Sequence, residues 1–137
     1  MRRLFERHSL RCTKQRELVY SALAATRAHP TAEDLYVAVR ASEPGLSLAT
    51  VYNALEAFTG AGLARRLANP CGPCRYDADM SDHVHVAMGD GRLMDVPQDL
   101  SARLVAGVPA EVLAELERRL GVRVGGISIR VVATDEE

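Results

Sequence analysis

The chain has 137 residues, 47% of them hydrophobic and 26% charged, and its formal net charge is −1. This length fits one domain or two small ones, and the apolar content is enough for a packed core. No apolar run approaches the roughly 20 residues that a membrane-spanning helix needs, and the N-terminus has no signal-peptide core, so we expect a cytoplasmic protein.

Three helices are predicted in the first half of the chain. Thr13 is expected to cap a helix over residues 14–26, Thr31 a second helix, and Ser47 a third. The inward face of the third helix is apolar and consists of Leu48, Val51, Leu55 and Phe58. Its outward face is small or polar and consists of Ala49, Thr50, Tyr52, Asn53 and Glu56.

Two short strands are predicted next, over residues 63–67 and 75–77. The turn between them, Asn69-Pro70-Cys71-Gly72-Pro73-Cys74, is rich in turn formers. Three helices followed by a hairpin is the element order of a winged helix-turn-helix, which we assign to residues 1–78. Residues 79–81 are interpreted as a linker.

The second half is predicted to contain strands over residues 83–88 and 92–96, helices over 98–106 and 110–120, and a last strand near 126–133. We expect residues 82–137 to form a small α/β domain. The fold class predicted for the chain is therefore α+β, with an N-terminal winged helix-turn-helix before this second domain.

The charge is divided unevenly between the two halves. Residues 1–69 carry ten Lys or Arg and six Asp or Glu, whereas residues 70–137 carry seven and twelve. A basic first half and an acidic second half indicate nucleic acid at one end and a cation at the other. Ordinary scatter of surface charge is the alternative.

The alternation around His83-Val84-His85 is typical of a β-strand, in which residues two apart share a face. Both imidazoles should therefore point the same way, with Asp77 and Asp95 as flanking acids. Imidazole and carboxylate ligands suit zinc, iron or manganese rather than a thiolate-binding metal. A polar strand face with two incidental histidines is the alternative.

The outward face of the third helix favours DNA binding, because a recognition helix needs small and polar residues in its first turns. Tyr52 and Asn53 can contact base edges or phosphates. Basic residues near the first helix, Arg11, Lys14 and Arg16, can supply phosphate contacts. A solvated helix face is the alternative.

Several segments together resemble the ferric uptake regulator family. The run from Leu10 to Arg16 is similar to that family's N-terminal signature, and the run from His29 to Tyr36 is similar to its second helix. Ser47-Leu48-Ala49-Thr50-Val51-Tyr52-Asn53-Ala54-Leu55 closely resembles its recognition helix, and His83-Val84-His85 matches its metal-binding strand. The resemblance covers roughly residues 8–96.

This resemblance implies a homodimeric, metal-activated repressor that binds an inverted-repeat operator in double-stranded DNA, with the second domain as the dimerisation domain. It implies one regulatory divalent metal per subunit, Fe²⁺ or Mn²⁺ with Zn²⁺ as a possibility, and a ligand set of His29, Asp77, His83, His85 and Asp95. Asp at position 77, with Asp95 as fifth ligand, resembles the peroxide-sensing branch. That branch implies oxidation of His29 or His83 beside iron.

Two features depart from the family pattern. The two Cys-x-x-Cys pairs of its structural zinc site are absent from the second domain, so we expect no structural Cys₄ zinc and a dimer held by apolar packing. Cys71 and Cys74 instead lie in the predicted wing turn, where a plain turn, a disulfide or a half-complete metal site are all open. The alternative functions are a metal-independent winged-helix regulator and, with less support, a thiol redox protein. No general-base, nucleophile or cofactor motif indicates an enzyme.

Overall fold

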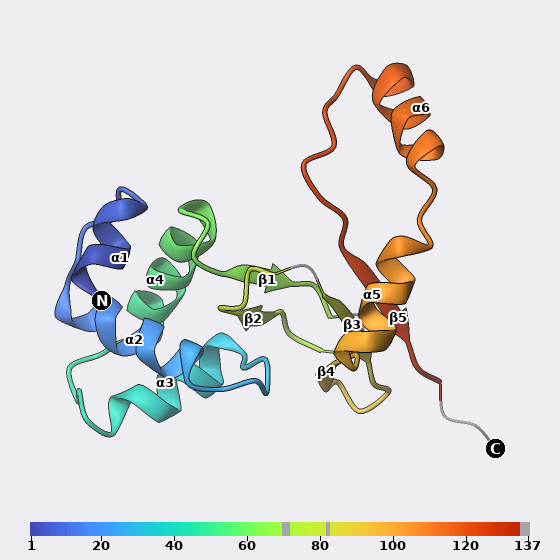
Figure 1. The fold of residues 1–137 in the computed structure, drawn as a ribbon. Coiled ribbons are helices and arrows are strands. Elements are labelled where there is room, and N and C mark those ends of the chain that lie inside the picture. The colour runs from blue at the N-terminus through green and yellow to red at the C-terminus, as the bar shows by residue number, and fades with distance from the viewer. Residues whose placement is uncertain (70–71, 82, 135–137) are drawn as a thin grey trace. The chain divides into compact units, whose positions relative to one another are not determined.

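The computed structural model describes residues 1–69, 72–81 and 83–134 and divides the chain into two compact units, Met1–Met80 and Ser81–Glu137 (Figure 1). Both units combine helices with a small β-sheet, which is antiparallel in the first unit and mixed in the second. This confirms the predicted α+β class. Within the described residues, none of the helices has the length and apolar character required to cross a bilayer.

The first unit begins with four helices, α1 (Arg2–Arg7), α2 (Lys14–Ala24), α3 (Ala32–Arg40) and α4 (Leu48–Gly60). The three predicted caps are confirmed, because Thr13, Thr31 and Ser47 each accept a hydrogen bond from the backbone N–H three residues later. The cap of α3 is a complete capping box, in which the Asp34 side chain also accepts from the Thr31 N–H.

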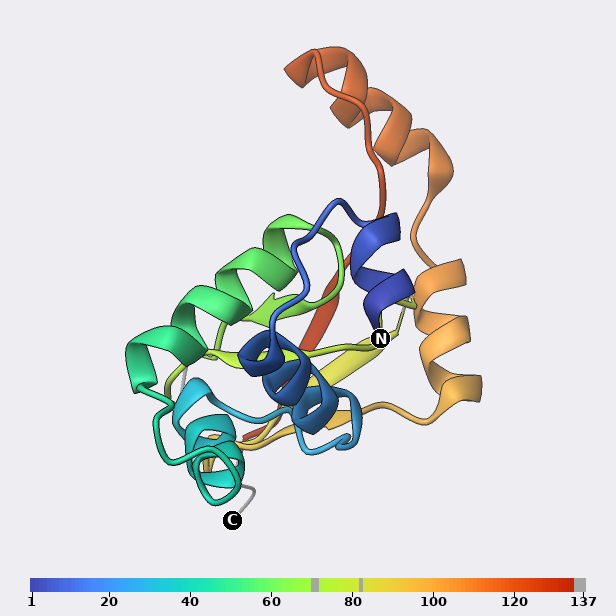
Figure 2. The ribbon, with the colours of Figure 1, turned by 90° about the vertical axis from the view of Figure 1, so that its left-hand side faces the viewer.

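The core of the first unit lies among these four helices (Figure 2). Phe5, Tyr20 and Phe58 form an aromatic cluster whose ring centroids are 5.4–5.8 Å apart. The pairs Phe5–Tyr20 and Tyr20–Phe58 are edge-on, and packing of that kind contributes about 0.5–1.5 kcal/mol per pair beyond the area buried. Because α4 supplies Phe58 and the fully buried Val51 to this core, its opposite face is held outward.

A Schellman motif ends α4 and turns the chain into the hairpin. The N–H of Leu63 donates to the Phe58 carbonyl at 2.9 Å, the N–H of Gly62 donates to the Thr59 carbonyl at 3.3 Å, and Gly62 has a φ of +78°. Strand β1 (Arg65–Leu67) then pairs antiparallel with β2 (Arg75–Asp77). This hairpin after α2, α3 and α4 is the predicted winged arrangement, with α1 as an additional helix before it.

The second unit is built on a three-stranded sheet of order β4-β3-β5. Strand β3 (Val84–Ala87) pairs antiparallel with β4 (Leu93–Asp95) and parallel with β5 (Ile129–Val132). The helices α5 (Gln98–Ala106) and α6 (Ala110–Leu120) connect β4 to β5, and α6 has no buried residue.

Several predicted boundaries were wrong. The first predicted helix ends at Ala24 rather than Thr26, since the Thr26 hydroxyl accepts from the Ala28 N–H in a separate turn. The strand predicted from residue 63 starts at Arg65, because Leu63 belongs to the Schellman motif. In the second unit, β3, β4 and β5 are each shorter than predicted, so that His83 precedes β3 instead of lying in it. Helix α1 was not predicted.

Candidate functional site

The outward face of α4 carries the residues predicted to contact DNA. Ala49, Tyr52 and Asn53 are exposed. Thr50 is half-buried, and its hydroxyl shares a 2.8 Å hydrogen bond with Ser47 in the helix cap. The side chain of Tyr52 is 44% exposed. The face is therefore free of bulky apolar side chains in its first two turns, as entry into a major groove requires.

Tyr52 is held by a residue of the preceding helix. Its hydroxyl donates to Glu33 Oε1 on α3 at 2.7 Å, and both side chains are exposed. This hydrogen bond to a carboxylate is the main cause that raises the pKa of Tyr52, which keeps the phenol protonated.

The three basic residues predicted to contact phosphate differ in how available their side chains are to a partner. Arg11 is exposed, and its backbone carbonyl accepts a hydrogen bond from Arg16 Nη1 at 2.9 Å. Lys14 lies 3.4 Å from the Glu43 carboxylate, but its side chain is largely exposed. Arg11 and Lys14 are thus available to an anionic partner, whereas Arg16 also fixes the segment before α2.

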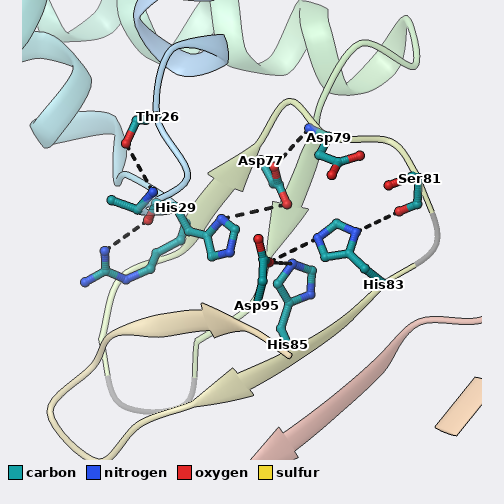
Figure 3. A network of polar contacts seen from close by, with 10 residues as sticks. Thr26, His29, Asp77, Asp79, Ser81, His83, His85 and Asp95 are labelled. Carbon is teal, nitrogen blue, oxygen red and sulfur yellow. Dashed lines mark hydrogen bonds and ion pairs between the residues drawn. The ribbon is translucent and has the colours of Figure 1, made fainter. Parts of the chain in front are cut away.

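The first unit holds two of the predicted metal ligands next to each other. His29 Nδ1 lies 3.7 Å from Asp77 Oδ2, and both side chains are buried (Figure 3). The other carboxylate oxygen of Asp77 accepts the Asp79 N–H at 2.9 Å. We call His29 and Asp77 the N-terminal half-site.

Strand β2 positions both members of the N-terminal half-site. Asp77 is its last residue. Arg75 Nη1 donates to the His29 carbonyl at 3.0 Å, and the Tyr76 N–H donates to the Pro30 carbonyl at 2.9 Å. His29 has a φ of +52°, a region that side-chain-bearing residues rarely adopt. These two hydrogen bonds therefore hold the loop in a conformation that places the imidazole beside the carboxylate.

The second unit holds the other three predicted ligands. Asp95 Oδ1 lies 3.2 Å from His83 Nε2 and 3.4 Å from His85 Nε2 (Figure 3). Asp95 pairs directly with His85 across β3 and β4, so the sheet register brings the two side chains together. The ring centroids of the two histidines are 4.3 Å apart. We call these three residues the C-terminal half-site.

The spacing of the ligand atoms around His83 makes the C-terminal half-site suited to a cation. His83 Nδ1 lies 2.8 Å from the Ser81 carbonyl, and because a carbonyl can only accept, Nδ1 carries the proton. His83 Nε2 faces a carboxylate oxygen of Asp95 at 3.2 Å, an arrangement that either a proton on Nε2 or a cation between the two atoms makes favourable. Two ligand atoms at about 2.1 Å from one tetrahedral or octahedral ion lie roughly 3.0–3.4 Å apart, so this donor set fits a divalent metal.

The predicted Cys71–Cys74 pair lies only partly within the described residues. Cys71 lies outside the described residues, and Cys74 is half-buried immediately before β2. The thiol of Cys12 donates to Glu17 Oε1 at 2.8 Å, and this hydrogen bond is the main cause that raises the pKa of Cys12. A raised thiol pKa lowers the fraction of reactive thiolate.

Sequence reasoning missed three residues that hold the candidate ligands or contacts in place. These are Glu33 beside Tyr52, Arg75 at the His29 carbonyl, and Ser81 at His83 Nδ1. Two of the three contacts join segments far apart in the chain, and the Ser81 contact uses a backbone carbonyl, so no motif spacing marks any of them.

Comparison with known proteins places the chain in context. The model of the "Ferric uptake regulator family" matches residues 7–108. The chain is 38% identical over 87 residues to the "Peroxide operon regulator" of Bacillus subtilis, a match that covers 63% of this chain and 60% of that protein. The chain thus matches about 60% of the length of such relatives.

Solved structures extend the likeness to the fold. The Campylobacter jejuni peroxide stress regulator has a TM-score of 0.70 and 26% identity, covering 98% of this chain and 96% of that one. The Vibrio cholerae ferric uptake regulator has a TM-score of 0.71 at 20% identity, covering 98% of both chains.

Proposed function

Because the chain belongs to the ferric uptake regulator family, we propose that it is a cytoplasmic, metal-dependent transcriptional repressor rather than an enzyme. The observation that carries the proposal is the pair of half-sites, in which histidines and aspartates from both units offer ligand atoms for a divalent metal. The relative from Bacillus subtilis is named as an operon regulator, which supports the regulatory role.

One metal ion would be held by His29 and Asp77 from the N-terminal half-site together with His83, His85 and Asp95 from the C-terminal half-site. Three imidazole nitrogens and carboxylate oxygens suit Fe²⁺ or Mn²⁺, with Zn²⁺ also accommodated. When bound, the ion supplies positive charge that neutralises the two aspartates and fixes both units to one centre. The hydrogen bond from His83 to the Ser81 carbonyl orients the imidazole for this task.

Metal binding would control DNA binding through the position of the first unit. A ligand that prefers one arrangement of two units shifts the population toward that arrangement. In a two-fold dimer this sets the spacing of two α4 helices, and the matching operator is an inverted repeat. The test is DNA binding of the purified protein with and without Mn²⁺, and equal affinity in both would favour the metal-independent alternative.

The second unit offers an apolar surface for the homodimer. Large hydrophobic side chains are exposed on α6 and β5, namely Val112, Leu116, Leu120, Val131 and Val132, with Leu120 67% exposed. Exposed apolar patches of this kind commonly mark protein interfaces. Within the described residues β5 pairs only with β3, so its outer edge can pair with another copy.

The dimer is expected to survive strong chelation of metal. The second unit contains no cysteine, so apolar packing rather than zinc–sulfur bonds would hold the two copies together. Light scattering of the protein after treatment with a strong chelator should report a dimer. A monomer after chelation would show that a structural metal holds the interface.

We expect α4 to make sequence-specific contacts with DNA bases, and the segment before α2 to make sequence-independent contacts with phosphates. Tyr52→Ala is expected to weaken binding to the operator by roughly 1–3 kcal/mol if Tyr52 reads a base. Arg11→Ala should weaken binding to all duplexes and reduce the slope of affinity against salt by about one released counterion. Binding titrations at several salt concentrations, with operator and random duplexes, distinguish the two effects. Unchanged affinity in both variants would contradict the assigned interface.

A further inference from the structure

The hydrogen bond between Tyr52 and Glu33 has a fixed direction. The Tyr52 hydroxyl has one proton, and that proton is donated to Glu33 Oε1 at 2.7 Å. A carboxylate has no proton to return. The pair therefore presents only acceptors to an approaching partner: the remaining lone pair of the phenol oxygen and the free lone pairs of the carboxylate.

The neighbours of Glu33 hold its backbone in a position from which its carboxylate can accept the Tyr52 hydroxyl. It lies in the first turn of α3, between Thr31 and Asp34, whose reciprocal hydrogen bonds of 3.0 and 3.1 Å close the capping box. Asp34 is thereby committed to the helix cap, while the adjacent Glu33 side chain reaches Tyr52 on α4. The acceptor pair thus rests on a fixed helix start rather than on a loop.

We propose that Glu33 is a specificity-determining residue, which makes Tyr52 an acceptor for the exocyclic amino group of a base in the major groove. This inference rests on the proposed DNA-binding function. In the major groove only adenine N6 and cytosine N4 donate hydrogen bonds, whereas guanine and thymine present acceptors. Phosphate oxygens are acceptors as well, so the Tyr52–Glu33 pair can make no favourable hydrogen bond with the DNA backbone. The negative charge of Glu33 also repels the phosphates.

The experiment is selection of bound sequences from random duplexes with Mn²⁺ present, using the wild type, Tyr52→Phe, Glu33→Ala and Tyr36→Phe. The last is a matched control, because Tyr36 packs against the core of the same unit and its ring lies 5.4 Å from the Arg40 guanidinium. The wild type and the control should select adenine or cytosine at one symmetric position of each half-site.

Tyr52→Phe should lose that preference, by about 5- to 150-fold for a contact of 1–3 kcal/mol. Glu33→Ala should instead broaden it to thymine or guanine, because the released phenol proton can then be donated to thymine O4 or guanine O6. Replacing the selected base by its analogue without the amino group, purine for adenine or 2-pyrimidinone for cytosine, should weaken the wild type but not Tyr52→Phe.

Three results would overturn the inference: a Tyr52-dependent preference for thymine or guanine in the wild type, an unchanged preference in Tyr52→Phe, or an unchanged preference in Glu33→Ala. Failure of the proposed function has a different signature, because the wild-type protein would then select no sequence at all. Circular dichroism of each variant establishes that the helices remain folded. Tyr52 and Glu33 are exposed, and Tyr36→Phe removes only a hydroxyl from a half-buried ring, so little loss of stability is expected.

Discussion

Substitution of His85 by alanine is expected to abolish metal-dependent DNA binding while both units stay folded. His85 supplies an imidazole nitrogen 3.4 Å from Asp95 Oδ1, and its loss leaves the C-terminal half-site with two donors. The neighbouring residues Val84 and Ala87 of β3, which are both buried, are unchanged. The fold should therefore survive even though the ligand set does not.

Thermal unfolding with and without Mn²⁺ measures this loss separately from DNA binding. A ligand at 100 times its dissociation constant stabilises a folded protein by about 2.7 kcal/mol, so wild type should unfold at a higher temperature with the metal. His85→Ala should show no such increase. His8→Ala is the matched control, because His8 is the one histidine outside both half-sites and its Nδ1 bonds the Ala61 carbonyl at 2.9 Å.

The same assay tests whether one ion joins the half-sites. Asp77→Ala removes a donor from the first unit, and His85→Ala removes one from the second. If a single ion uses both half-sites, each substitution alone should remove the metal-induced increase in unfolding temperature and the metal-dependent gel shift. Wild-type DNA affinity with metal in either variant would contradict a shared ion and favour metal-independent binding.

The agreement between sequence and fold is best where local chemistry decides the structure. The caps at Thr13, Thr31 and Ser47 were predictable because each is a hydrogen bond between residues three apart. Helix α1 was missed because it has six residues and no side-chain cap. Its formation depends on burial of Phe5 against residues far along the chain, which local patterns do not report.

The ends of the strands and the contacts between side chains depend on how strands and helices pair in three dimensions, not on the alternation of polar and apolar residues along the sequence. The alternating pattern continues to His83, but pairing with β4 starts at His85 and pairing with β5 at Val84. In the candidate site, the residue types indicate metal chemistry, while the geometry comes from sheet register and backbone hydrogen bonds. The partnership of Tyr52 with Glu33 could not be predicted, because it depends on how α3 packs against α4.

Peroxide treatment of the iron-loaded protein is expected to add one oxygen atom to His29 or His83 and to release the DNA. The proposal rests on the carboxylates Asp77 and Asp95 beside the histidines, and on the likeness to the Bacillus subtilis peroxide operon regulator. With Fe²⁺ held by these residues, peroxide would act as the two-electron oxidant: one of its oxygen atoms is added to an imidazole carbon and the other leaves as water. An oxidised imidazole nitrogen or carbon is a poorer ligand, so metal and then DNA affinity should be lost.

The manganese-loaded protein is the internal control, because the same ligands are present and Mn²⁺ should resist peroxide. Mass spectrometry of both forms locates the change, and gel shifts measure release of DNA. The competing route is a disulfide between Cys71 and Cys74, in which the two thiols lose two hydrogens, peroxide is reduced to water, and a thiol reductant restores the starting state. An oxygen added to a histidine, only with iron and not reversed by reductant, supports the metal route. A protein that gains neither change and stays on DNA would be a metal sensor that does not respond to peroxide.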